Sequence, residues 1–143
     1  MAKNKQIEFR YQCQIFQWAD RNQDKYPELA FLEGSMNGVR LLPGVIQKAK
    51  AAGCLKKGRP DIHLPVKRGN FGALFIELKT EEEGSKPDPD QEIYLTGLQA
   101  LGNYVAVCIG VEATKKAIIG YLEEILEGMN GSDQGPLGWW NNI

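Results

Sequence analysis

Apolar residues recur every three or four positions in four segments of the chain, which is the spacing of helices that bury one face. In the first segment Ile7, Tyr11 and Ile15 form the apolar stripe. In the second, Pro43 suits the first helical turn and Gly53 suits the C-terminal cap. The pattern predicts helices over residues 5–25, 43–52, 91–101 and 112–127.

Four other segments have the composition of β-strands and are bounded by turn-forming residues such as Asn37 and Gly38. They cover residues 29–33, 61–66, 73–79 and 105–109. Residues 67–72 join the second and third strands as a hairpin, and the third strand is apolar up to Ile76, so we expect it at the centre of the sheet. The order α-β-α-β-β-α-β-α predicts an α/β protein, a mixed sheet flanked by helices.

The size and composition of the chain predict one globular domain, because 143 residues with 43% hydrophobic residues can bury one core. We expect this domain at residues 1–127, followed by a tail at residues 128–143. The tail contains Trp139 and Trp140, and the sequence does not indicate what these two residues do. The start of the chain is polar and the longest apolar run is too short to cross a bilayer, which predicts a cytoplasmic protein without membrane contact.

Charge is segregated along the chain, although the formal net charge is only −1. From Arg40 to Arg68 eight basic residues accompany a single acid, Asp61, whereas from Glu81 to Asp133 eleven acids accompany three lysines. A basic segment around a lone aspartate favours an anionic ligand held near an acidic centre. The candidate phosphate contacts, each of which could equally be solubilising surface charge, are Arg40, Lys56, Lys57 and Arg59.

The candidate residues for a metal-binding or catalytic site lie at the end of the predicted hairpin. Glu77 and Lys79 lie two positions apart on a strand and therefore project to one side, while Leu78 points to the other. Antiparallel pairing would bring Asp61 near both, and two carboxylates at a sheet edge suit Mg²⁺ or Mn²⁺, with the Leu78 backbone carbonyl as a further ligand. Lys79 could then position or activate a water. The simpler alternative is an ordinary ion pair on a surface strand.

The same residues, in this order, resemble a known nuclease signature. The PD-(D/E)XK pattern is matched by Pro60-Asp61, by Glu77-Leu78-Lys79, and by Gln91 with Leu95. Residues 5–125 resemble more closely the stand-alone VRR-Nuc domains of phages and bacteria, through "GRPDIHLP", "GALFIELK" and "YVAVCIG". The resemblance implies a restriction-endonuclease-like core and hydrolysis of phosphodiester bonds in DNA.

The resemblance also implies roles for individual residues. Asp61 and Glu77 would bind the divalent metal ion, Mg²⁺ or Mn²⁺, and Lys79 would serve the attacking water. Gln91 would orient the site or contact the nucleic-acid backbone.

The site of the family also bears on three further residues. The family has a glutamate on its first helix that completes the metal shell, and Glu8 is the match, with Glu33 as the competitor. His63 lies two residues after Asp61, where it could touch a metal-bound water or a phosphate, although a lone histidine is more often structural. The acidic run at residues 81–83 is expected to be a solvated loop.

Stand-alone members of the family imply a structure-selective endonuclease that acts as a homodimer on branched DNA such as a four-way (Holliday) junction, in the host cytoplasm if phage-encoded. A non-catalytic nucleic-acid-binding module would retain the basic segment but would not need to align Asp61, Glu77 and Lys79. An interaction protein would explain the paired tryptophans. A sequence-specific restriction-type endonuclease would need elements that read base edges, for which this short chain has little room.

Overall fold

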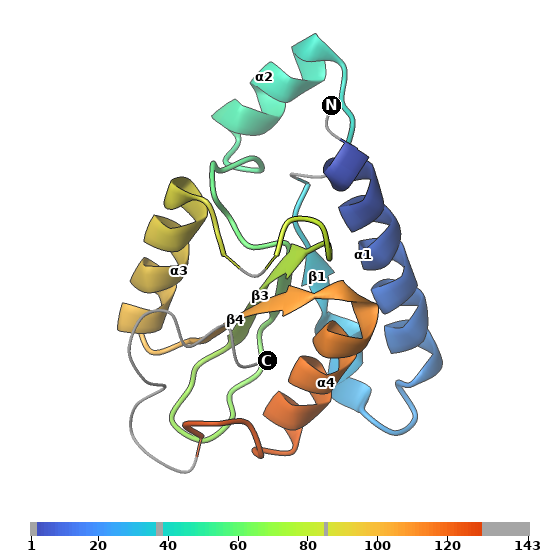
Figure 1. Cartoon of the computed structure of the whole chain (residues 1–143), viewed down its shortest axis with the longest axis vertical. Coiled ribbons are helices and arrows are strands. Elements are labelled where there is room, and N and C mark those ends of the chain that lie inside the picture. The colour runs from blue at the N-terminus through green and yellow to red at the C-terminus, as the bar shows by residue number, and fades with distance from the viewer. Residues whose placement is uncertain (1–2, 37–38, 85, 130–143) are drawn as a thin grey trace.

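The computed structural model describes residues 3–36, 39–84 and 86–129, and it is an α/β fold with helices on both sides of one sheet. Figure 1 shows α3 (Pro89–Ala100) on one side of the sheet and α1 (Lys3–Arg21) with α4 (Gly110–Leu122) on the other. The predicted order of helices and strands is confirmed. The predicted turn at Asn37 and Gly38, and the tail from residue 130 onward, lie outside the described residues.

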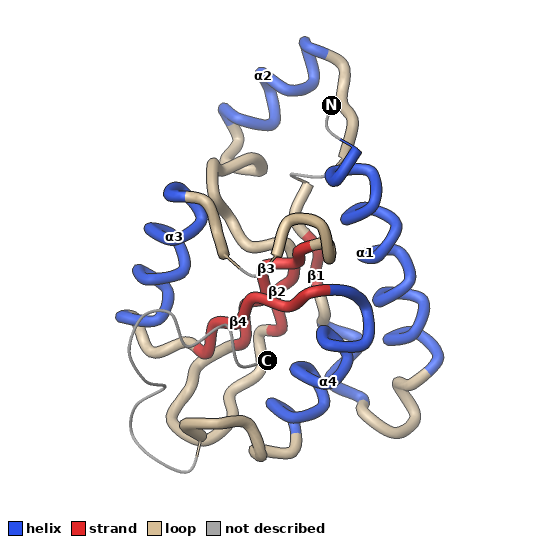
Figure 2. Tube along the Cα trace, in the orientation of Figure 1, coloured by secondary structure: helices blue, strands red, loops and turns tan. Residues whose placement is uncertain are grey.

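The sheet has four strands in the order β1-β2-β3-β4, coloured red in Figure 2. They are β1 (Glu33–Gly34), β2 (Ile62–Leu64), β3 (Leu74–Lys79) and β4 (Tyr104–Ile109). β2 pairs antiparallel with both β1 and β3, whereas β3 and β4 run parallel. β3 lies between β2 and β4 and is buried on both faces, so its expected central position is confirmed.

The register of the β2–β3 hairpin determines which of the candidate site residues lie next to each other. Ile62 lies opposite Ile76, and Leu64 lies opposite Leu74. Extending this register by one residue places Asp61 opposite Glu77, which agrees with the prediction that antiparallel pairing brings Asp61 near Glu77 and Lys79. β2 is shorter than the predicted 61–66, because Pro65 has no backbone N–H for the ladder and the chain turns there.

Residues 29–33 are the clearest error of the sequence prediction. A 3₁₀ helix, η1 (Pro27–Phe31), occupies most of the segment, and only Glu33 belongs to a strand. Pro27 stands at the helix start, where its fixed φ angle favours a helical turn. The turn directs Leu29, which is 2% exposed, into the core.

The last helix also differs from its prediction, because α4 ends at Leu122 and not at residue 127. Glu124 adopts a left-handed φ of 57°, which ends the helix. The chain then folds back on α4, so that a Cβ on Gly120 would lie 2.5 Å from Leu126 Cδ2. Met129 packs into the core beyond this turn.

The second helix, α2 (Pro43–Ala51), stands apart from the sheet at the top of Figure 1. Pro43 occupies its first turn, and Gly53 follows its end with a φ of 78°, both as predicted. None of its residues is buried. Within the described segments, every helix is too short or too polar to traverse a lipid bilayer.

Candidate active site

Asp61 is fixed by backbone contacts at the entrance to β2. Its carboxylate Oδ2 accepts a hydrogen bond of 2.7 Å from the Leu78 backbone N–H, and its carbonyl accepts one of 2.8 Å from Ser35. Asp61 is buried, with 7% of the residue exposed to solvent. The hairpin thus holds the Asp61 carboxylate at the end of β3, next to Glu77.

Glu77 is the most deeply buried acid of the site, at 1% exposure. Its Oε2 accepts a hydrogen bond of 2.8 Å from Gln91 Nε2 and lies 3.9 Å from Lys79 Nζ. Its other oxygen, Oε1, is buried and has no hydrogen-bond partner among the described residues. A buried carboxylate oxygen without a donor is costly unless a proton or a cation occupies that side.

Lys79 lies on the same side of β3 as Glu77, as predicted, and is also buried. Its Nζ donates a hydrogen bond of 2.8 Å to Gln91 Oε1 and lies 4.0 Å from Glu83 Oε2. Leu78 between them is fully buried on the opposite face. The ammonium group is therefore held within the carboxylate cluster and is not a mobile surface charge.

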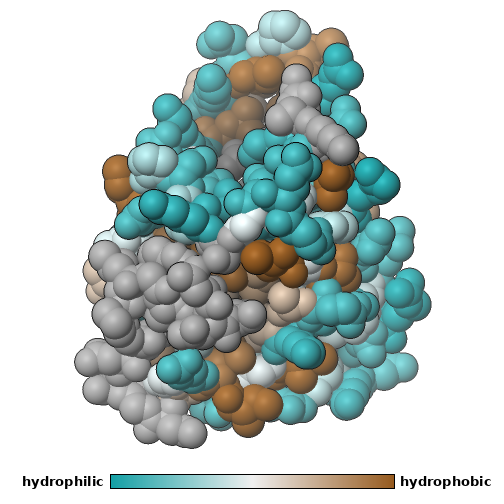
Figure 3. All heavy atoms as spheres, viewed as in Figure 1, coloured by the Kyte–Doolittle hydropathy of each residue, from teal (hydrophilic) through white to brown (hydrophobic). Residues whose placement is uncertain are grey.

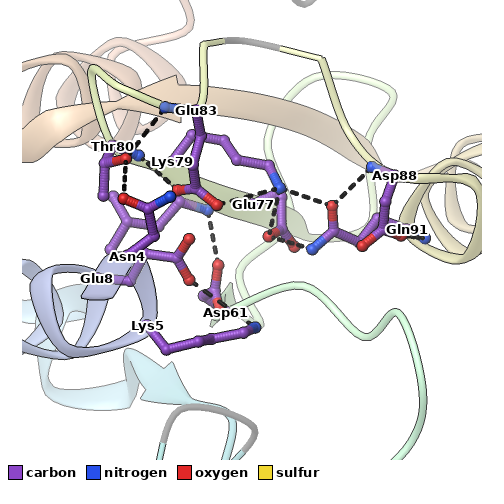
Figure 4. Close-up of polar contacts among 11 residues, drawn as sticks. Asn4, Lys5, Glu8, Asp61, Glu77, Lys79, Thr80, Glu83, Asp88 and Gln91 are labelled. Carbon is purple, nitrogen blue, oxygen red and sulfur yellow. Dashed lines mark hydrogen bonds and ion pairs between the residues drawn. The ribbon is translucent and has the colours of Figure 1, made fainter. Parts of the chain in front are cut away.

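Gln91 connects Glu77 to Lys79, because its amide contacts both at 2.8 Å (Figure 4). It is held in turn by a capping box at the start of α3. Asp88 accepts a hydrogen bond from the Gln91 N–H at 3.0 Å, and Gln91 Oε1 accepts one from the Asp88 N–H at 2.9 Å. The fold of the helix start thus fixes the amide that orients the site.

Glu8 reaches the same cluster from α1. Figure 4 shows its carboxylate pointing toward Asp61, and its side chain is 8% exposed. Glu83, from the loop after β3, lies on its other side and also accepts a hydrogen bond of 2.8 Å from the Thr80 N–H. Of the two glutamates that the sequence left as candidates, Glu8 is the one that the fold brings to Asp61 and Glu77.

The crowding of buried acids raises their pKa values. Burial, a hydrogen bond with Glu83 and the charge of Asp61 raise the pKa of Glu8 to about 8. Burial and the charge of Asp61 raise the pKa of Glu77 well above its usual value. Burial also raises the pKa of Asp61, against the Leu78 N–H, which acts to lower it. The cluster therefore favours bound cations, whether protons or metal ions.

The donor set is compatible with a hard divalent cation. Glu8, Asp61 and Glu77 provide carboxylate oxygens, and Glu77 Oε1 has no competing donor. Across the described residues, no three acidic, imidazole or thiol side chains are arranged as a metal-binding group. Mg²⁺ does not require such a group, since it retains several waters and binds through one or two carboxylates plus substrate phosphate.

Glu33 and His63 form a separate pair on β1 and β2. His63 stacks on Phe75 with ring centroids 4.3 Å apart, and its Nδ1 lies 3.6 Å from Glu33 Oε1. Burial lowers the pKa of His63, although Glu33 acts to raise it. Glu33 is exposed on β1, at one edge of the sheet, and so it lies outside the buried carboxylate cluster. Contact of His63 with a metal-bound water or a phosphate stays a prediction.

A cleft of about 430 Å³ opens beside the carboxylates, and its lining includes Asp61 and Gln91. Three of the four predicted phosphate contacts line the cleft, namely Lys56, Lys57 and Arg59. Two lysines that the sequence analysis did not name as site residues, Lys5 and Lys50, also line it. Arg40 is exposed and is not part of this lining. Most of the predicted basic contacts therefore face the same space as the carboxylates.

Glu83 is the other site residue that the sequence did not single out. Desolvation acts to raise its pKa, but hydrogen bonds from Glu8 and from the Thr80 N–H outweigh it, so the net pKa is lowered. The expected solvated loop at 81–83 is thus correct for the exposed Glu81 but not for Glu83. The spacing from Thr80 to Glu83, which permits a side-chain turn, was the available signal.

Comparison with known proteins supports this fold. No family model matches the sequence, and no curated protein matches it. A solved structure described as a "VRR_NUC domain protein" is similar, with a TM-score of 0.65 and 23% sequence identity, over 81% of this chain and 88% of that chain. The chain therefore has the fold of a VRR-Nuc domain, as the resemblance in sequence predicted.

Proposed function

We propose that the protein is a divalent-metal-dependent endonuclease of the PD-(D/E)XK type that hydrolyses phosphodiester bonds in DNA. One observation carries the proposal: Asp61, Glu77 and Lys79 converge in a buried cluster that adjoins a cleft lined by basic side chains. An ordinary ion pair on a surface strand would be solvated, whereas Glu77 and Lys79 are buried. Similarity to a structure described as a VRR_NUC domain protein agrees with this activity.

Asp61, Glu77 and Glu8 would hold the Mg²⁺ or Mn²⁺ ion, with the Leu78 carbonyl as a further ligand. The ion would supply charge stabilisation at the phosphodiester and lower the pKa of a bound water. The support in this chain is the unpaired Glu77 Oε1 and the raised pKa values of the three acids.

Lys79 and Gln91 would position the reacting water and the ligands. Lys79 carries its donor group beside Glu77, within reach of any water held there. Gln91 fixes the orientation of both, because one amide bonds Glu77 Oε2 and Lys79 Nζ. We therefore assign Lys79 to the attacking water and Gln91 to the positioning of Glu77 and Lys79.

The basic side chains of the cleft would bind the phosphate backbone. Lys57 is 3.2 Å from Asp90 and largely exposed, so phosphate could replace this carboxylate. Contacts of this kind supply affinity and salt dependence without reading sequence. The preference of the enzyme would then come from the shape of the DNA.

Branched DNA, such as a four-way junction, is the proposed substrate, and a homodimer is the proposed active form. Both follow from the resemblance to stand-alone members of the family. Two copies would present two active sites to one branched substrate, which a single chain of this size would not.

The test is cleavage of labelled four-way junction, flap, single-stranded and linear duplex DNA with Mg²⁺, Mn²⁺ or EDTA. Wild type is compared with Asp61→Asn, Glu77→Gln and Lys79→Met, which keep the size of each side chain. Asp24→Asn, an exposed acid after α1, is the matched control. We expect metal-dependent cutting by wild type and the control, and none by the three site variants.

The result also separates the alternatives. Salt-dependent DNA binding without any cleavage would leave a non-catalytic binding module. A fixed cleavage sequence on linear duplex would favour a restriction-type enzyme. Cleavage at the wild-type rate by a folded Asp61→Asn protein, with its circular dichroism unchanged, would contradict the assigned role of Asp61.

A further inference from the structure

Besides the acids Asp61, Asp88 and Asp90, the lining of the cleft has two chemically different parts. One part consists of basic side chains that suit phosphate. The other consists of apolar side chains from α2 and its flanking loops: Met36, Val39, Leu41, Ile46 and Leu55. Phosphate binding would need only the basic part, so the apolar part requires a different occupant.

These apolar side chains are not explained by the core. α2 buries no residue, and Met36 and Val39 are 36% and 38% exposed beside it. Figure 3 shows hydrophobic side chains on the surface over α2 and its neighbouring loops. Apolar groups that gather at the surface around one cleft indicate a binding site.

The dimensions of the cleft favour a single nucleotide. Its volume of about 430 Å³ lies within the range of about 300–1,000 Å³ for sites that bind one small ligand. A base within a duplex cannot enter such a site, because it is paired and stacked. An unpaired base has a free apolar face, which can pack on side chains, and a phosphate on either side.

We propose that the cleft receives an unpaired nucleotide of the DNA substrate, next to the phosphodiester that is cleaved. The base would pack against Val39, Leu41 and Ile46, while its phosphates contact the lysines of the cleft. This inference rests on the proposed nuclease function and specifies its substrate class as DNA with an unpaired nucleotide, as at a flap, a bulge or a distorted junction. Recognition through the base face would tolerate any sequence.

The arrangement of the loop at residues 52–60 supports a preformed site. Gly58 has a φ of 82°, and a Cβ there would lie 2.4 Å from the Asp90 carbonyl oxygen. The loop therefore lies directly against the start of α3, which also carries Gln91. The basic part of the cleft is thus fixed relative to the carboxylates before any DNA binds.

The test compares two DNA duplexes of identical sequence, one of which carries a single additional, unpaired 2-aminopurine. Binding is measured in EDTA, so that it does not depend on cleavage, at one salt concentration. We expect wild type to bind the bulged DNA roughly tenfold more tightly than the duplex, as expected for one packed base. The fluorescence of the 2-aminopurine should change on binding.

Ile46→Ser tests the apolar part, because Ile46 lies on a helix that contributes no buried residue. The Ile46→Ser protein should lose most of the preference for bulged DNA and most of the 2-aminopurine fluorescence change, while its affinity for the duplex stays unchanged. Val39→Ser should do the same and serves if Ile46→Ser does not fold. Ile93→Ser, exposed on α3 and outside the cleft lining, should retain both.

Equal affinity of wild type for the two DNAs, or an equal loss for both in Ile46→Ser, would overturn the proposed pocket. Cleavage of the same DNAs is measured separately with Mn²⁺. Absent cleavage with the binding preference intact would reject the nuclease function and leave the pocket. Cleavage without the preference would reject the pocket and leave the nuclease function.

Discussion

Gln91 Nε2 donates a hydrogen bond of 2.8 Å to Glu77 Oε2, across 14 residues of sequence and from a different element of the fold. The other atom of the amide accepts from Lys79 Nζ, so the amide can have only one orientation that satisfies both contacts. A helix start thereby sets the geometry of a strand end.

Replacement of Gln91 by Ala should lower the cleavage rate about 10–100-fold, the usual loss when a group that orients metal ligands is removed. The concentration of Mn²⁺ that gives half-maximal rate should rise, which a purely structural role would not produce. Gln99→Ala, on the same helix, is the control. An unchanged Mn²⁺ requirement in Gln91→Ala would show that Gln91 does not orient the ligands.

The raised pKa values predict that the protein becomes less stable as pH rises. Glu8, whose pKa rises from 4.5 to about 8 on folding, keeps a proton that the unfolded chain releases between these values. Its stabilising contribution is complete below pH 4.5 and is lost as pH rises through about 8. Asp61 and Glu77 shift in the same direction. We therefore expect the melting temperature in EDTA to fall between pH 5 and pH 8.5.

Glu8→Gln should make this fall shallower, because a neutral amide releases no proton, whereas Glu112→Gln, at an exposed position, should leave the pH profile unchanged. Added Mn²⁺ should raise the melting temperature of wild type more at pH 8 than at pH 5, since it competes with protons for the same oxygens. Identical pH profiles for wild type and Glu8→Gln would show that Glu8 is not the titrating group.

Lys57 and Asp90 predict opposite effects on DNA binding. Lys57→Ala should weaken binding to all sequences and reduce the slope of log K against log salt by about 0.9. Asp90→Asn should strengthen binding, because it releases Lys57 from an ion pair of 3.2 Å. Fluorescence anisotropy over a salt series measures both, with Lys116→Ala on α4 as the control. A loss confined to one sequence would contradict a phosphate contact.

Substitutions of Gly58 and Gly53 test whether the loop that carries the basic residues lies against α3, because the two glycines differ in their surroundings and not in their backbone conformation. Both have left-handed φ values, 82° and 78°, but a Cβ would meet the Asp90 backbone at Gly58 and nothing within 4 Å at Gly53. Gly53→Ala should cost about 1–2 kcal/mol from backbone conformation alone. Gly58→Ala should cost clearly more and should also weaken DNA binding. Equal unfolding free energies in urea would contradict a close contact with α3.

The sequence predicted those parts of the fold that depend on local pattern. Two-residue alternation placed Glu77 and Lys79 on one side, and antiparallel pairing of the hairpin placed Asp61 near both. Residues 27–31 could not be predicted in this way, because an apolar segment of that length is equally compatible with a strand and a helical turn.

The remaining site residues depended on packing between distant elements. Glu8 lies beside the apolar stripe of α1, so the sequence pattern is compatible with a side chain that faces either solvent or the sheet. Only the packing of α1 in the folded protein brings Glu8 to Asp61. Glu83 turns inward because Thr80 and Lys79 contact it, while its neighbour Glu81 bonds Tyr11 at an exposed position. Such contacts arise from the tertiary fold and leave no periodic trace in the sequence.

The isolation of α2 has a consequence for how this protein can change over generations. Its residues contribute nothing to the buried core, so most substitutions of its exposed residues by residues other than glycine or proline should alter the free energy of unfolding by about 0.5 kcal/mol or less. The carboxylate cluster, by contrast, is embedded among buried strands and helices and tolerates little variation. Substitutions in α2 could therefore accumulate while the carboxylate cluster stays constant, which would let related chains acquire different surfaces beside the cluster without first having to regain a stable scaffold.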